Sequence, residues 1–208
     1  MKHDSQTDSA FELSMSEIAA LSARALRGAG RSWGEAEEGA EAACWLARAG
    51  LDWASALLEV LALSTKDKGC PLRAGIALAD CAGLPDGLSS ATAQRHKLHC
   101  PCFVLPFAAR VANQTGRGIM LEWAGGRVML PPNCAPALEG LASATATAEV
   151  TITPVAPERA PCPDWPQTHR GAVSAAQYAR LMDFMMAFTV PSSASSLVGA
   201  GARGDDND

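Results

Sequence analysis

Residues 23–47 read ARALRGAGRSWGEAEEGAEAACWLA and contain the strongest structural signals in the chain. A glycine turn, Gly28–Gly30, separates two helical patterns. Glycine ends helices readily because it adopts the left-handed conformation without a steric penalty. Ser32 and Glu35 then have the Ser-x-x-Glu spacing of a capping box, which opens a second helix. The stretch therefore predicts two helices joined by a tight corner.

Helical patterns continue on both sides of this corner. Another capping-box pattern, at residues 14–17, opens the first helix, and Asp52 is placed to cap a third one. We expect a short helix at 72–82 and a long final helix at 174–188, where apolar residues recur at helical spacing. On the second helix, Trp33 is predicted to face inward as the large anchor of an otherwise small-residue face.

Strand patterns follow in the second half of the chain. Residues 119–123 and 127–130 flank a glycine loop, as is typical of a hairpin. Residues 149–153 indicate a further strand, and 103–111 a strand followed by a helix. The order predicts an α+β fold with a helical N-terminal half, a small antiparallel sheet with a hairpin at 119–130, and a long C-terminal helix.

The chain has 208 residues, which suits one domain. We expect a disordered N-terminus at 1–12, a single globular domain at 13–190, and a Ser/Gly/Asp-rich tail at 191–208. Composition alone predicts disorder for the tail, because Ser, Gly and Asp bury little surface. Alternatively, the tail folds back, and its glycines allow a close approach of the backbone to a ligand.

Charge and composition exclude several classes of protein. A net charge of −5 argues against binding to nucleic acid or to an anionic membrane. The N-terminus lacks the apolar segment of a signal peptide, and no run approaches the roughly 18 apolar residues of a membrane span. Seven cysteines, an odd number, are typical of a compartment in which thiols stay reduced. We therefore expect a cytoplasmic protein, with a homo-oligomer possible.

Two arginines flank the glycine turn just before a helix N-terminus, where exposed amides favour phosphates and carboxylates. This pattern predicts a site for a small-molecule anion, formed by the turn and the folded-back tail. Glu37 and Glu38 are weak candidates for acid/base catalysis. The turn lacks the preceding strand and third glycine of a dinucleotide fingerprint, and the cofactor stays unknown. The alternative is a helical corner with solvated arginines. The predicted ligand-binding residues are Arg27, Gly28, Gly30, Arg31, Trp33, Ser192, Ser195, Gly199 and Gly201.

A second candidate site consists of His96, His99, Cys100 and Cys102. These four side chains are of the types that bind zinc. However, one short segment rarely surrounds a tetrahedral ion, and zinc sites ordinarily combine two distant ligand pairs. The two cysteines also lack the Cys-x-x-Cys spacing of a redox motif. We therefore predict no metal site and keep this cluster as the weaker alternative.

The two ends of the chain resemble an uncharacterised bacterial family that is catalogued as a domain of unknown function. The start has the pattern Arg-Gly-Ala-Gly-x-Ser-Trp-Gly, and the ending has Gly-Ala-Gly followed by Asp-Asn-Asp. The resemblance covers nearly the whole chain from Leu13 onward and implies no particular activity, cofactor or substrate. The family pattern has a basic residue after the tail serines, where this chain has Leu197. The segments that carry the resemblance are 13–17, 25–38, 70–75, 105–109, 190–193, 199–201 and 206–208.

Two functions remain open at this point. One is a small-molecule (anion) binding protein or an enzyme of small-molecule metabolism. The other is a non-catalytic subunit or protein-interaction module, in which Trp33, Trp45, Trp53 and the methionines of 181–186 form the core and a partner surface. The sequence has no Gly-x-Ser-x-Gly nucleophile motif, which would have favoured an enzyme.

Overall fold

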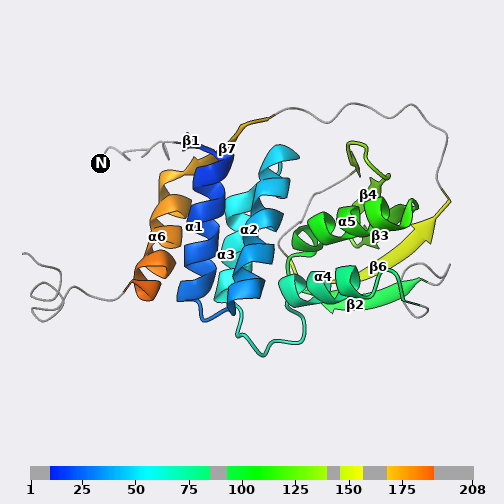
Figure 1. Ribbon diagram of the computed structural model, residues 1–208, viewed down its shortest axis with the longest axis horizontal. Helices are drawn as coiled ribbons and strands as arrows, with labels where there is room; N and C mark the ends of the chain where they lie inside the picture. The colour runs from blue at the N-terminus through cyan, green and yellow to red at the C-terminus, as the bar shows by residue number, and fades with distance from the viewer. Residues whose placement is uncertain (1–9, 85–92, 140–145, 157–167, 190–208) are drawn as a thin grey trace, which may run out of the picture.

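The computed structural model of the chain describes residues 10–84, 93–139, 146–156 and 168–189 (Figure 1). Helices and antiparallel strands make up an α+β fold, so the predicted class is confirmed. The elements are β1 (Ala10–Ser14), α1 (Met15–Gly28), α2 (Trp33–Arg48), α3 (Trp53–Ala62), α4 (Pro71–Asp80), β2 (Gln94–Leu98), the 3-10 helix η1 (Pro101–Val104), α5 (Leu105–Thr115), β3 (Gly118–Trp123), β4 (Gly126–Leu130), β5 (Ala137–Glu139), β6 (Ala148–Val155), β7 (Arg170–Ser174) and α6 (Ala175–Phe188).

Helices α6, α1, α2 and α3 form a helical layer on one side of the molecule (Figure 1). Strands β1 and β7 pair antiparallel across one end of this layer, with Ala10 opposite Ser174 and Ser14 opposite Arg170. Because each strand leads directly into a helix, the pairing places α6 against α1. Residues 10–12 are thus part of a strand, which corrects the prediction of disorder for them; residues 1–9 lie outside the described residues.

The other side of the molecule is a lobe built on a five-stranded antiparallel sheet in the order β2-β6-β3-β4-β5. Helices α4 and α5 cover one face of the sheet (Figure 1). The predicted hairpin is confirmed as β3 and β4, and its turn includes Gly125 with φ +95°. Buried and partly exposed residues alternate along β6, as expected of a strand with one face on the core.

One apolar core runs through both sides of the molecule. Trp53 is fully buried in it, and its Nε1 donates a hydrogen bond to the carbonyl of Ala172 on β7 at 2.9 Å. Phe107 of α5 is equally buried and packs over Gly75 of α4, where an added Cβ would lie 2.3 Å from the ring. The two sides meet where α2 packs against α4 and α5, and an added Cβ at Gly39 of α2 would lie 3.5 Å from the Leu72 side chain of α4.

Both predicted capping boxes are present. The Ser14 hydroxyl accepts from the amide of Glu17, whose carboxylate accepts from the amide of Ser14, and Ser32 and Glu35 repeat the arrangement. The hydrogen bonds from Ser14 hold the pKa of Glu17 below its ordinary value. Burial would raise the pKa of Glu35, but the hydrogen bonds from Ser32 and the nearby arginines lower it overall.

Four expectations need correction. Residues 101–104 form η1 rather than a strand, because Pro106 sits in the first turn of α5, where a missing amide hydrogen costs nothing. The C-terminal helix is not long: α6 has 14 residues and α2 has 16. Trp33 is 63% exposed and does not anchor the inner face of α2. Cys134 is disulfide-bonded, although the sequence suggested reduced thiols.

None of the helices within the described residues has both the length and the apolar character that a membrane crossing requires.

Candidate functional site

The two glycines of the predicted anion site have structural roles. Gly28 is the last residue of α1, and an added Cβ would lie on the backbone carbonyl of Phe184 in α6. Gly30 has φ +80°, a left-handed conformation that favours glycine. The first glycine therefore allows α1 and α6 to approach closely, and the second allows the chain to turn toward α2.

Arg31 points into the protein and is fully buried. Its Nη2 donates to the carbonyls of Val60 and Leu63, each at 3.0 Å. These carbonyls lie at the C-terminal end of α3, the negative end of the helix dipole, which stabilises a cation. Nε and Nη1 of Arg31 have no hydrogen-bond partner in the part of the chain that the structure describes. Arg31 thus ties the turn to α3.

Arg27 lies in a surface cluster with two aromatic rings. Its guanidinium carbon lies 4.5 Å from the ring centre of Trp33 and 5.5 Å from that of Phe188, and Nη1 donates to the carbonyl of Arg31. The two rings meet edge to face at 5.8 Å. We call Arg27, Trp33 and Phe188 the aromatic cluster. Its cation already has partners, so an anion would have to compete for it.

The tail residues of the predicted anion site cannot be placed against the turn. Ser192, Ser195, Gly199 and Gly201 all lie outside the described residues. The site at the turn therefore stays a prediction.

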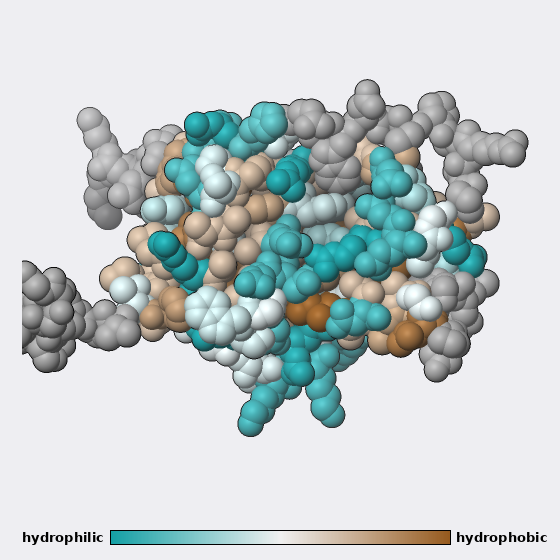
Figure 2. All heavy atoms as spheres, viewed as in Figure 1, coloured by the Kyte–Doolittle hydropathy of each residue, from teal (hydrophilic) through white to brown (hydrophobic). Residues whose placement is uncertain are grey.

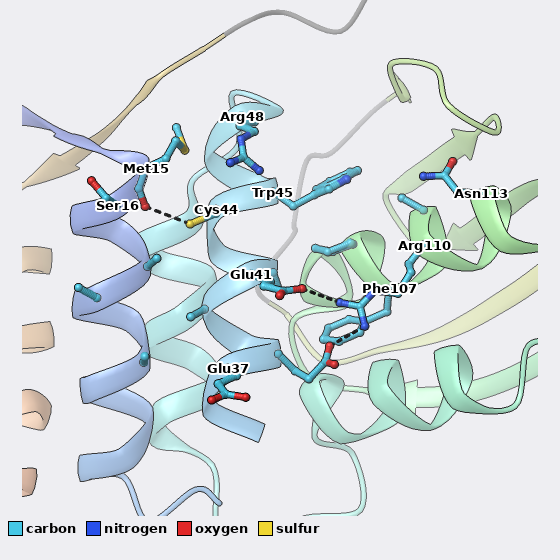
Figure 3. A pocket seen from close by; sticks show the side chains of 18 residues that line it. Met15, Ser16, Glu37, Glu41, Cys44, Trp45, Arg48, Phe107, Arg110 and Asn113 are labelled. Atoms are coloured by element: carbon cyan, nitrogen blue, oxygen red, sulfur yellow. Dashed lines mark hydrogen bonds and ion pairs between the residues drawn. The ribbon is translucent and has the colours of Figure 1, made fainter. Parts of the chain in front are cut away.

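Glu37 and Glu38 line a cleft of about 960 Å³ between α1 and α2 on one side and α5 on the other (Figure 3). Arg110 reaches across from α5: Nη1 lies 2.7 Å from Glu38, and Nη2 donates to Glu41 at 2.9 Å. The Glu38 contact is an ion pair without the angles of a hydrogen bond. Hydrophilic side chains gather across the centre of this face of the molecule (Figure 2).

Cys44 also lines the cleft, but its thiol is not a reactive one. Its Sγ donates to the carbonyl of Met15 at 3.3 Å, and burial raises the pKa of the thiol. The nucleophilic form of cysteine is the thiolate, so this residue does not supply a nucleophile at neutral pH.

The histidine and cysteine cluster is divided by the fold. Cys100 and Cys102 are buried with their sulfur atoms 3.3 Å apart, and the hydrogen bond between them raises the pKa of Cys100. His96 and His99 instead line a separate pocket. Within the described ranges, no three His, Cys, Asp or Glu side chains are grouped so as to hold a metal ion.

That second pocket has a volume of about 690 Å³. It lies between the edge strand β2 and the segment that leads into α4, and we call it the cationic pocket. His99 is held through both ring nitrogens: Nδ1 is hydrogen-bonded to Thr147 at 2.8 Å, and Nε2 lies 3.4 Å from Asp67. Burial lowers the pKa of His96, so this imidazole is neutral at pH 7. The described lining residues are Lys68, Gly69, Ala74, Arg95, His96, Lys97, Leu98, His99 and Thr147.

Three cationic side chains line the pocket. Lys68, Arg95 and Lys97 are exposed, and none of them forms an ion pair within the part of the chain that the structure describes. Glu149 is opposite Lys97 on β6, and no carboxylate is among the described lining residues. Helix α4 begins beside the pocket, and no side chain caps its N-terminus at Cys70. The carboxylate of Asp67 lies just before this helix and accepts from the amide of Gly69 at 2.7 Å.

Sequence reasoning missed these three cations. They come from two segments separated by α4, and only the pairing of β2 into the sheet brings them together. The available signal was the alternation of basic residues at 95 and 97, which places both on one side of a strand.

The predicted resemblance is confirmed for one part of the chain. Residues 13–96 match the model of a protein family of unknown function, DUF3726. The match contains α1 to α4 and the start of β2, and the C-terminal motifs lie beyond it. No curated protein and no solved structure matches the chain.

Proposed function

We propose that this chain is a cytoplasmic bacterial protein that binds a small anionic molecule in the cationic pocket. One observation carries the proposal: Lys68, Arg95 and Lys97 line a single pocket, and none has an acidic partner among the described residues. Like charges repel one another where no ion pair offsets them, so an anion between these cations would stabilise the folded protein.

The chemistry of the pocket favours a phosphate ester or a polycarboxylate. Lysine and arginine supply the charge that such a group requires. Both ring nitrogens of His99 are already engaged, by Thr147 and Asp67, so its ring serves as a fixed wall of the pocket. His96 is neutral at pH 7, and its Nε2 is hydrogen-bonded to the side-chain oxygen of Gln94 at 3.3 Å, so it adds no charge to the pocket. Since the cations are exposed, each contact is modest, and we expect a dissociation constant on the order of 0.1 mM at low salt.

The Arg95→Gln/Lys97→Gln double variant is expected to weaken anion binding about tenfold or more, because it removes two of the three charges. Isothermal titration calorimetry at low ionic strength measures this, with inorganic phosphate, pyrophosphate and citrate as probes. Binding should also weaken as salt is added to the wild-type protein.

Lys66→Gln is the matched control. Lys66 is an exposed cation on the same segment as Lys68 but does not line the pocket, so its loss should leave the affinity unchanged. Affinity that falls equally in both variants would indicate a general charge effect, and binding unaffected by the double variant would contradict the proposal. No binding by any of the three anions would also contradict it.

A second candidate function, a protein-interaction module, is favoured by the aromatic cluster. Trp33 is 63% exposed, and Met186 nearby on α6 is 57% exposed, both unusual for large apolar side chains. Trp45 and Trp53 do not belong to this surface, since Trp45 lines the cleft and Trp53 is buried.

If this surface mediates homo-oligomerisation, Trp33→Ala should abolish concentration-dependent self-association, because an exposed tryptophan is a common anchor of interfaces. Sedimentation velocity over a wide concentration range tests this. Phe11→Ala, which truncates another exposed aromatic residue at the opposite end of the helical layer, should have no effect. A wild-type protein that stays monomeric throughout would contradict homo-oligomerisation by this surface.

A further inference from the structure

The cleft between α2 and α5 is polarised along its length. Glu37, Glu41, Cys44 and Arg48 follow one another at intervals of three and four residues, so all four lie on the face of α2 that lines the cleft. Figure 3 shows Glu37 at one end of this face and Arg48 at the other. The two lie three helical turns apart, about 16 Å at 1.5 Å per residue.

The charges at the two ends are unpaired, whereas the charges between them are engaged. Glu38 and Glu41 are paired with Arg110 from α5. Glu37 and Arg48 have no ion pair in the described ranges of the chain. A ligand that enters the cleft therefore meets a carboxylate at one end and a guanidinium at the other.

The walls between the two ends suit an extended chain. Small side chains form much of the lining on α1 and α2, namely Ala19, Ala20, Ala23 and Ala40, and these leave room for a backbone. Trp45 and Asn113 face the cleft near Arg48 from opposite sides (Figure 3). The Oδ1 of Asn113 accepts from the amide of Asn133 at 2.6 Å, which directs the Nδ2 group of the same side chain elsewhere as a donor.

A smaller pocket of about 340 Å³ adjoins the cleft at the Arg48 end. It shares Trp45, Arg48, Ala109 and Asn113 with the cleft and adds the apolar Leu130 and Pro131 together with Asn133 and Cys134. If the carboxylate of a ligand binds Arg48, the side chain next to that carboxylate would lie at this smaller pocket.

We infer that the cleft binds a short peptide in an extended conformation. The peptide's ammonium group pairs with Glu37, its terminal carboxylate pairs with Arg48, and its last side chain, an apolar one, occupies the smaller pocket. An extended chain rises about 3.3 Å per residue, so the rise of about 16 Å between these two positions of α2 corresponds to about five residues. The inference concerns a site separate from the cationic pocket and does not depend on the proposed function.

Calorimetric titration with the pentapeptide Ala-Ala-Ala-Ala-Leu tests each end separately. Four forms are compared: unmodified, N-acetylated, C-amidated, and modified at both ends. Acetylation should weaken binding to the wild-type protein about tenfold, and amidation by a similar factor, because each removes one charge-assisted contact. In Glu37→Gln the effect of acetylation should disappear while that of amidation stays; in Arg48→Gln the reverse should hold.

Glu59→Gln and Arg24→Gln are matched controls, since both are exposed charges on neighbouring helices that do not line the cleft. They should preserve the wild-type pattern. A dipeptide of the same composition should bind more weakly than the pentapeptide because it cannot reach both ends. Binding that is insensitive to the end groups, or equally sensitive in all variants, would overturn the inference. The inference would also be overturned if the unmodified pentapeptide did not bind the folded wild-type protein.

Discussion

Gly28→Ala is expected to lower the free energy of unfolding by about 3 kcal/mol, the upper part of the range for overpacking a close contact. The new methyl group would overlap the carbonyl of Phe184, a backbone atom that cannot rotate away as a side chain can. Either the end of α6 must separate from α1 or both helices must shift. Equilibrium unfolding in urea, followed by circular dichroism, measures the loss.

Gly34→Ala is the control for this substitution. Gly34 lies in the first turn of α2, and an added Cβ there would meet no atom within 4 Å. This change should be neutral or should stabilise the protein by about 0.5–1 kcal/mol, since alanine is the better helix former. A Gly28→Ala protein as stable as wild type would show that the close approach of α1 and α6 is not required.

Arg31→Ala is expected to lower the free energy of unfolding by about 3 kcal/mol. The substitution removes both hydrogen bonds from the guanidinium to the end of α3 and leaves a cavity at a fully buried position. The substitution also removes the free-energy cost of burying a charge with two unpartnered N–H groups. This gain is smaller than the loss, because the carbonyl of Leu63 is left without its guanidinium partner.

Arg24→Ala separates this structural effect from a general effect of charge. Arg24 is exposed on α1, one turn before the corner, and its truncation should change stability by less than about 0.5 kcal/mol. Thermal and urea unfolding of both variants measure these two changes in stability. If Arg31→Ala keeps its stability, the buried guanidinium is not a structural residue, and the prediction of an anion site at the turn gains weight.

Local signals predicted much of the fold. The capping boxes at Ser14 and Ser32 are in place, as are the cap at Asp52 and the β3–β4 hairpin. These features depend on residues within a few positions of one another, which is the range over which sequence patterns act. Strand β1 was missed because its pairing partner, β7, lies at the other end of the described chain.

The candidate sites could be predicted only in part. Glu37 and the two histidines were singled out by residue type for other roles, acid/base catalysis and metal binding, and the structure places them in the cleft and the cationic pocket. Lys97 and Arg110 were not identified from the sequence. Lys97 lines a pocket only because the segment before α4 lies beside it, and Arg110 pairs with carboxylates on α2.

The sequence by itself determined where the helices around residues 23–47 begin and end, because caps and glycines act on the adjacent backbone. Only the tertiary structure decided what the special residues of this stretch do. Gly28 is a packing residue because α6 lies against it, and Arg31 is buried because α3 ends beside it. The physical reason is that burial and charge pairing depend on neighbours distant in sequence, and no local pattern contains them.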